Sequence, residues 1–300
     1  MLSTRESLAR KVAWISVWSN VVLMVGKTVV GWFGHSDAVF ADGIHSAADV
    51  FASVIVLLVI KVANKPADEE HPYGHGKAEV IVSGIVGLIL LLVAFYVVFE
   101  AIIGFFHQLQ SPSILALWVA LFSYLLKELL YRYSLNVATK NNSKAIEAIA
   151  YDHKADIVAS IAAAIGVVLS LIGEYLHLSF LLYGDKVASI FVAYLIFRIS
   201  QGILAESFNI LMESNVNHDL MKELEETIHS FPDVRRIDRV RAREHGNYIL
   251  VDIRISIDYN KTIKEGHDLG KQIKQALMKR NDHIQEVLIH LNPYFPDDKQ

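Results

Sequence analysis

The sequence predicts a membrane protein in two parts, an all-α domain of six membrane-spanning helices followed by a C-terminal α+β domain. Apolar residues make up 53% of the 300 residues and charged residues only 20%. Six apolar stretches are each near or above the roughly 20 residues that cross a bilayer. From about Glu206 onward, amphipathic helix and strand patterns replace these stretches.

The six predicted spans alternate with connections of opposite character. The spans are residues 12–33, 38–60, 80–106, 114–133, 146–173 and 181–204. Lys and Arg occur in the segments 1–11, 61–77 and 132–144, whereas the segments 34–37, 107–113 and 174–180 contain neither. The positive-inside rule then places both termini in the cytoplasm, and an even number of spans agrees with termini on the same side. We therefore expect a cytoplasmic N-terminus (1–11), a membrane domain (12–205) in the cell membrane and a cytoplasmic domain (206–300).

The cytoplasmic part shows the order helix, strand, strand, helix, strand. Residues 217–230 place Leu220, Leu224 and Ile228 at helical spacing, and residues 262–279 form a second helical stretch. Residues 248–257 alternate, with Ile and Val at odd positions and Tyr248, Leu250, Asp252 and Arg254 at even ones, which is typical of a half-buried strand. Weaker strands are predicted at 236–243 and 286–291. These elements indicate a small α+β domain.

Composition excludes several classes of function. The chain has no cysteine, so it contains no disulfide, thiolate metal site or cysteine nucleophile, and any metal chemistry must use His and carboxylates. A net charge of −4 gives no reason to expect nucleic-acid binding.

Ionisable side chains lie within the second predicted span. Asp42, His45 and Asp49 follow one another at helical spacing, so they share one stripe of the helix. Each charge at that depth costs about 3 kcal/mol or more, which favours a functional role. A single intramembrane His can also simply hydrogen-bond a neighbouring helix. We place Asp42, close to the outer end, in an outer vestibule.

The fifth predicted span repeats the pattern with Asp152, His153 and Asp156. With a rise of about 1.5 Å per residue, His45 and Asp49 lie roughly 10–17 Å from the outer end of their span, and Asp152 and Asp156 roughly 9–15 Å from the inner end of theirs. The two sets therefore share a level near the bilayer middle and predict one four-ligand metal site. The choice between Asp152 and His153 stays open.

The loop after the second span concentrates a further set of possible ligands. Asp68, His71 and His75 lie within eight residues, and Pro72, Gly74 and Gly76 allow tight turns that bring them together. The alternative is an ordinary solvated acidic loop.

Together these features closely resemble the cation diffusion facilitator transporters. The resemblance covers nearly the whole chain, and the string His-Pro-Tyr-Gly-His-Gly-Lys-Ala-Glu at 71–79 is its most specific part. Members are homodimeric secondary active antiporters, not enzymes, that exchange Zn²⁺, Fe²⁺ or Mn²⁺ for protons and export the metal. The resemblance implies six helices and a ferredoxin-like, metallochaperone-like cytoplasmic domain.

The resemblance also implies roles for individual residues. The transport site would be His45, Asp49, Asp152 and Asp156, and the loop site Asp68, His71 and His75. Lys77 would pair across the dimer, with Glu213 as the candidate partner. A binuclear site of the cytoplasmic domain would fall on Asp238, Asp252, His267, His290 and Asn292. Only His267 and His290 keep the family residue there, so metal binding by this domain stays open.

The residue types of the predicted site bear on which metal it binds and which other functions are compatible with the sequence. One His beside three Asp favours Fe²⁺ or Mn²⁺ over Zn²⁺ without excluding Zn²⁺. A non-transporting membrane metal sensor or scaffold of the same fold would lose the transport set, which is complete here. A metalloprotease would need His-Glu-x-x-His, which is absent. Two other intramembrane charges, Lys27 and Glu100, are near the outer ends of their spans, where we expect them to reach the interface.

Overall fold

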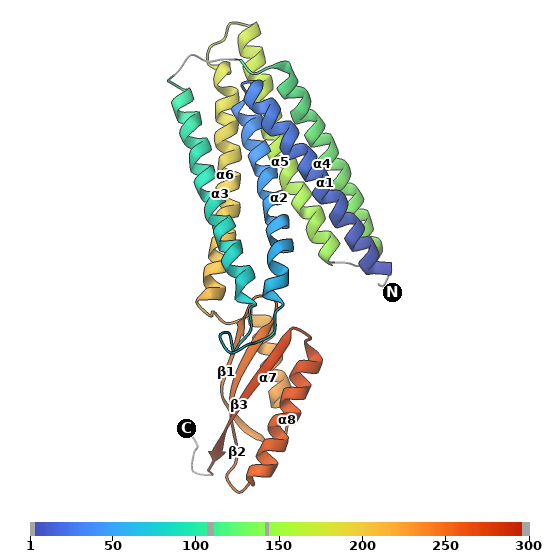
Figure 1. Cartoon of the computed structure of the whole chain (residues 1–300), viewed down its shortest axis with the longest axis vertical. Coiled ribbons are helices and arrows are strands. Elements are labelled where there is room, and N and C mark those ends of the chain that lie inside the picture. The colour runs from blue at the N-terminus through green and yellow to red at the C-terminus, as the bar shows by residue number, and fades with distance from the viewer. Residues whose placement is uncertain (1–3, 107–110, 142–143, 296–300) are drawn as a thin grey trace. The chain divides into compact units, whose positions relative to one another are not determined.

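The computed structural model describes residues 4–106, 111–141 and 144–295 (Figure 1). The chain forms two compact units. One contains the chain up to Val56 together with Ile85–Leu204, and the other contains Leu57–Gly84 and the chain from Ala205 onward. The loop between the second and third helices thus groups with the C-terminal domain.

Six long helices correspond to the predicted spans. They are α1 (Thr4–Phe33), α2 (Asp37–Ala63), α3 (Lys77–Gly104), α4 (Ile114–Asn141), α5 (Lys144–Tyr175) and α6 (Gly184–Leu211), with a short 3₁₀ turn, η1 (Leu181–Tyr183), before the last. Among the described residues, α1, α3, α4, α5 and α6 are long and apolar enough to cross a membrane. The span predicted on α2 stays a prediction, because its side chains at 52–53, 55–58 and 60–61 lie outside the description.

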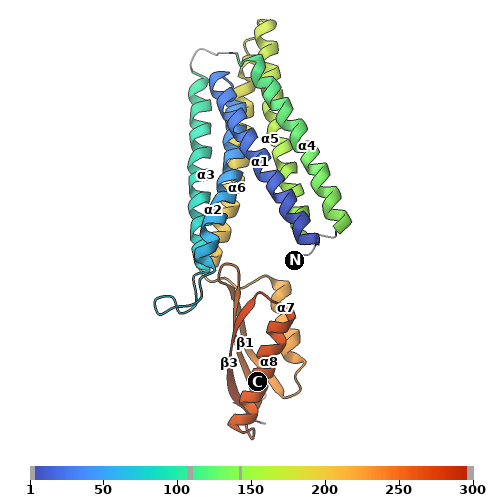
Figure 2. The same cartoon turned by 45° about the vertical axis from the view of Figure 1, so that its right-hand side comes forward.

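Small side chains line the contacts between these helices. One buried cluster joins Ala41 and Ala48 of α2 to Ala159 of α5 and Ala193 of α6. Another joins α2, α4, α5 and α6 largely through alanines. In lipid, where solvent does not drive helices together, small residues let backbones approach closely. Large apolar side chains such as Trp18, which is 63% exposed, point outward as a lipid-facing surface requires. Figure 2 shows α1, α4 and α5 side by side.

The C-terminal domain is the predicted α+β unit. Its elements are α7 (His218–His229), β1 (Val234–Glu244), β2 (Ile249–Asp258), α8 (Ile263–Arg280) and β3 (Ile284–Tyr294). The sheet order is β1-β2-β3, with β1 antiparallel and β3 parallel to the central β2. This is the ferredoxin-like order without its first strand. All five elements were predicted, with ends that differ by a few residues.

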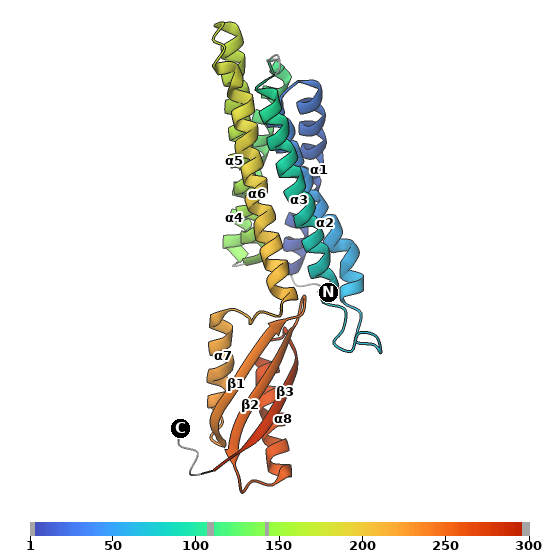
Figure 3. The ribbon, with the colours of Figure 1, turned by 90° about the vertical axis from the view of Figure 1, so that its left-hand side faces the viewer.

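One face of the sheet carries both helices (Figure 3). Val251, Ile253 and Ile255 of β2 are at most 1% exposed and pack against apolar residues of α7 and α8. This confirms the odd-numbered face as the core face. Leu250, predicted on the opposite face, is also buried, and it lines a cavity together with Ala63 at the end of α2 and Tyr73 of the loop between α2 and α3.

Candidate metal centres

The predicted transport residues of α2 and α5 face each other inside the helical unit. His45 Nε2 lies 3.4 Å from Asp156 Oδ1, and both side chains are buried. Asp49, one turn after His45 on α2, is half-buried, and Asp152, one turn before Asp156 on α5, is exposed. The structure therefore brings one His and one carboxylate into contact, but among the described residues the four predicted ligands do not form a group of three ligand atoms within 4.8 Å of one another.

A buried lysine that the sequence reasoning missed lies in the same place. Lys127 of α4 is 0% exposed, and its Nζ donates hydrogen bonds to Asp156 and, over 2.6 Å, to Asn20 Oδ1. The signal was available, because a lysine within the apolar span 114–133 is as costly in a membrane as the aspartates that we singled out.

His153 also faces this interior. It is fully buried, and its Nδ1 lies 4.0 Å from Asp156 Oδ2. Within the described part of the chain, neither ring nitrogen has a hydrogen-bond partner. Buried polar groups are normally paired, so this imidazole is a second possible ligand of α5. The geometry leaves Asp152 and His153 as alternatives, with His153 directed inward and Asp152 exposed.

Two of our predictions for the outer half are wrong. Lys27 does not reach the interface, and Asp42 does not line an outer vestibule; both are 0% exposed. Lys27 Nζ lies 2.9 Å from Asp42 Oδ2, and the hydroxyls of Ser46 and Ser160 accept from Lys27 at 3.1 and 3.3 Å. Ser160 also donates to Asp42 over 2.8 Å. Each buried charge is tolerated because the other one, with these hydroxyls, neutralises it.

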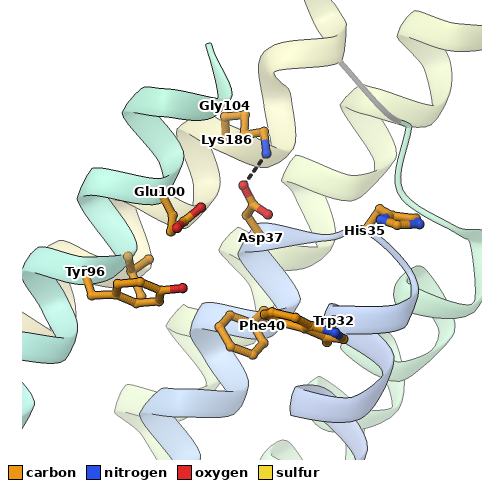
Figure 4. Close-up of a pocket in the computed structure, with 10 residues that line it drawn as sticks. Trp32, His35, Asp37, Phe40, Tyr96, Glu100, Gly104 and Lys186 are labelled. Carbon is orange, nitrogen blue, oxygen red and sulfur yellow. Dashed lines mark hydrogen bonds and ion pairs between the residues drawn. The ribbon is translucent and has the colours of Figure 1, made fainter. Parts of the chain in front are cut away.

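A cavity of about 430 Å³ opens near the start of α2 (Figure 4). Its lining combines aromatic and charged side chains: Trp32, His35, Asp37, Phe40, Tyr96, Glu100 and Lys186. Lys186 pairs with Asp37, as the dashed line shows. Glu100 is exposed here, as expected for a residue near the end of its span. Because Lys186 offsets the charge of Asp37, the lining as a whole is only weakly acidic.

The loop residues Asp68, His71 and His75 form a compact cluster. Their ligand atoms all lie within 4.8 Å of one another, the only such group of three or more in the described part of the chain. Asp68 lies 3.4 Å from both His71 Nδ1 and His75 Nε2. The backbone N–H of His71 donates to Asp68 over 2.7 Å, and this bond, helped by the two imidazoles, lowers the pKa of Asp68. The carboxylate is therefore kept in its ligand form.

The loop is anchored to the C-terminal domain by short polar contacts within one unit. Tyr248 Oη donates to the carbonyl of Tyr73. Gly74 has a φ of +89°, a conformation that glycine adopts without strain. A Cβ on residue 74 would lie 2.5 Å from the Tyr248 hydroxyl oxygen and would collide with it.

Lys77 and Glu213 form the predicted salt bridge, but within a single chain. Lys77 Nζ lies 3.1 Å from Glu213 Oε1, and Arg243 Nη1 lies 2.8 Å from Glu213 Oε2. The hydrogen bond from Lys77 and the charge of Arg243 lower the pKa of Glu213. We predicted this pair across a dimer, whereas here it joins the start of α3 to the segment after α6.

Of the residues predicted for the cytoplasmic-domain site, Asp238 and Asn292 meet, but in the described part of the chain the His and Asp members form no group of three ligand atoms within 4.8 Å of one another. Asp238 accepts hydrogen bonds from Ser256, Asn292 and Arg236 at 2.7, 2.9 and 2.7 Å. Partial burial raises the pKa of Asp238, but these bonds outweigh it and the pKa is lowered. His267 and His290 are exposed, and Asp252 lies 3.9 Å from Arg243.

Comparison with known proteins extends these observations to the whole chain. The model of the cation efflux transmembrane domain matches residues 13–212, and that of the cation efflux protein cytoplasmic domain matches residues 216–294. The manganese efflux system protein MneP of Bacillus subtilis is 53% identical over 297 residues, covering 99% of this chain and 100% of that protein.

More distant relatives cover nearly the same length. The magnetosome protein MamB of Paramagnetospirillum magneticum is 32% identical, covering 94% of each chain. The manganese efflux system protein MneS of Bacillus subtilis is also 32% identical with the same coverage. Both domain matches follow one another along this chain, as the two-part fold requires. The chain therefore belongs to the cation diffusion facilitator family and is a membrane transporter for metal cation efflux.

Proposed function

We propose that this transporter exports Mn²⁺ from the cytoplasm in exchange for protons, with His45, Asp49, Asp152 and Asp156 as its transport site. The observation that carries the proposal is the buried contact between His45 and Asp156, which joins α2 and α5 at ligand-like spacing. Three carboxylates beside one imidazole suit Mn²⁺, which prefers oxygen ligands. The relative with 53% identity is named for manganese efflux, which supports the same ion over Zn²⁺ and Fe²⁺.

Exchange follows from the chemistry of the ligands. A metal ion binds deprotonated carboxylates and neutral imidazole, so its arrival releases protons and protons compete it off again. His45 is the natural proton carrier of the set, since imidazole exchanges protons nearest neutral pH. Neutralisation by metal or by protons lowers the cost of moving buried carboxylates between the two faces. Rocking of the helices would expose the site alternately to each side.

A metal panel in vesicles tests this function. Proteoliposomes with an imposed pH gradient should accumulate Mn²⁺ at a higher kcat/KM than Zn²⁺, Fe²⁺, Co²⁺ or Cd²⁺, and dissipating the gradient should stop accumulation. Intravesicular metal is read with a fluorescent indicator or by elemental analysis. Equal uptake with and without the gradient would exclude proton exchange, and a preference for Zn²⁺ would exclude manganese as the principal substrate.

We further propose that both termini and the 68–75 loop lie in the cytoplasm, where Asp68, His71 and His75 collect the metal. Two copies of the chain would form a homodimer through the cytoplasmic domains. A regulatory site that uses Asp238, Asp252, His267 and His290 would then need ligands from both chains, because one chain does not bring them together.

The loop site predicts a change in KM. In the same assay, His75→Ala should raise the KM for Mn²⁺ by roughly tenfold, because the loss of one ligand weakens a site of three. The kcat should stay near its original value, because these residues lie outside the transport site. His177→Ala, a substitution of an exposed His in the other unit, is the matched control and should leave both constants unchanged. An unaltered KM in His75→Ala would remove the loop from the transport cycle.

A further inference from the structure

The ammonium of a buried lysine contacts one of the proposed transport ligands. Lys127 Nζ is hydrogen-bonded to Asp156, whose other carboxylate oxygen lies 3.4 Å from His45. Metal bound through Asp156 would stand within a few ångströms of this ammonium. Two positive charges that close repel each other strongly in a buried site. The ammonium and the metal ion therefore cannot both interact strongly with the Asp156 carboxylate at the same time.

The surroundings hold the ammonium where it can leave Asp156 without losing every partner. Nζ also donates to Asn20 Oδ1 over 2.6 Å, so an acceptor from α1 remains when Asp156 turns to a metal ion. One turn before Lys127, Ser123 is hydrogen-bonded to Ser160 over 2.9 Å, which fixes α4 against α5 at this level. The lysine is thus positioned beside the site by two neighbouring helices.

We propose that Lys127 is a tethered cation that occupies the transport site in place of the metal, and that Mn²⁺ binding displaces its ammonium from Asp156. The inference rests on the proposed transport site. Moving the metal-free site through the membrane costs less free energy when the lysine ammonium balances the carboxylate charge than when the carboxylates are unpaired. The same charge weakens metal binding and so assists release. Lys127 is a positioning and affinity-determining residue that contacts a ligand, not the metal.

The second buried lysine shows what a purely structural pair looks like. Lys27 is equally buried, but its partners are Asp42, Ser46 and Ser160, none of which is a proposed ligand. Removal of that pair should leave metal affinity unchanged. The two lysines therefore supply a matched comparison within one domain.

The experiment measures KM and kcat for Mn²⁺ uptake by proteoliposomes of the full chain. Lys127→Met, which keeps the length but not the charge, should lower KM by about tenfold or more, because no fixed cation competes for Asp156. Its kcat should fall at least threefold, because release and return of the empty site become slower. Lys127→Arg retains the charge and should keep a KM near that of the parent. Lys27→Met/Asp42→Asn should also keep the parental KM.

Each outcome decides between the possibilities. If the parent chain transports no Mn²⁺, the proposed function fails first. If the parent transports Mn²⁺ but Lys127→Met has an unchanged or higher KM, Lys127 does not compete with the metal and the inference is overturned. Lys127→Gln, which can donate to Asp156 without a charge, gives the same readout if Lys127→Met does not fold. If neither variant is recovered even when purified with Mn²⁺, the pair is structural and the inference is likewise overturned.

Discussion

Mn²⁺ uptake is expected to fall by about a hundredfold or more, to the level of protein-free vesicles, when Asp49 or Asp156 is replaced by alanine. Each substitution removes a carboxylate from the proposed ligand set on α2 and α5, and an incomplete set of ligands neither holds a divalent ion nor exchanges it for protons. The measurement is metal uptake driven by a pH gradient, with the amount of reconstituted protein matched by immunoblot.

Loss of transport must be separated from loss of fold. Asp156→Ala also deprives Lys127 of its counter-ion, which destabilises a buried charge. Asp156→Ala/Lys127→Met removes both charges and should elute as a folded protein yet remain inactive. Substantial uptake by Asp49→Ala or by this double variant would place the transport site elsewhere.

The same assay decides between the two candidate ligands of α5. With Asp152 in the transport site, Asp152→Asn should raise the KM for Mn²⁺ more than His153→Gln does. The structure keeps the comparison open, because His153 is fully buried near Asp156 whereas Asp152 is exposed. The opposite order of effects would put His153 into the ligand set in place of Asp152.

Asp42→Ala is expected to cost about 3–5 kcal/mol of stability, because it leaves the Lys27 ammonium buried without a counter-charge. Ser46 and Ser160 would still accept hydrogen bonds from Lys27, but neutral hydroxyls do not replace a carboxylate. The purified chain in detergent should show a clearly lower midpoint of thermal unfolding, measured by tryptophan fluorescence. The amount of folded protein recovered from the membrane should fall as well.

A double variant tests the cause. Lys27→Met/Asp42→Leu removes both charges and fills similar volume, so it should recover most of the stability lost in Asp42→Ala. The two single effects are then strongly non-additive, which is the signature of a direct pair. Additive losses in the double variant would mean that Asp42 stabilises the bundle by some contact other than Lys27.

The sequence alone predicted the parts of this protein that follow from local pattern. Long apolar stretches become helices in a bilayer, and the period-two alternation of 248–257 becomes the central strand, because both depend on burying apolar side chains against a known surface. The short-range ligand cluster Asp68, His71 and His75 was also predictable. Its members are close in sequence, and Pro72, Gly74 and Gly76 leave few ways for the loop between them to run.

What only the tertiary structure decided is which charges meet. Each contact of Lys27 and Lys127 joins two different helices. The contacting residues are 15 positions apart for Lys27 and Asp42, 29 for Lys127 and Asp156, and 107 for Lys127 and Asn20. Helical periodicity places a residue on a face, but the rotation and contact of neighbouring helices determine its partner. A lone charge in an apolar span therefore signals that a partner exists without naming it. Here the tertiary structure pairs the candidate metal ligand Asp156 with a lysine of α4.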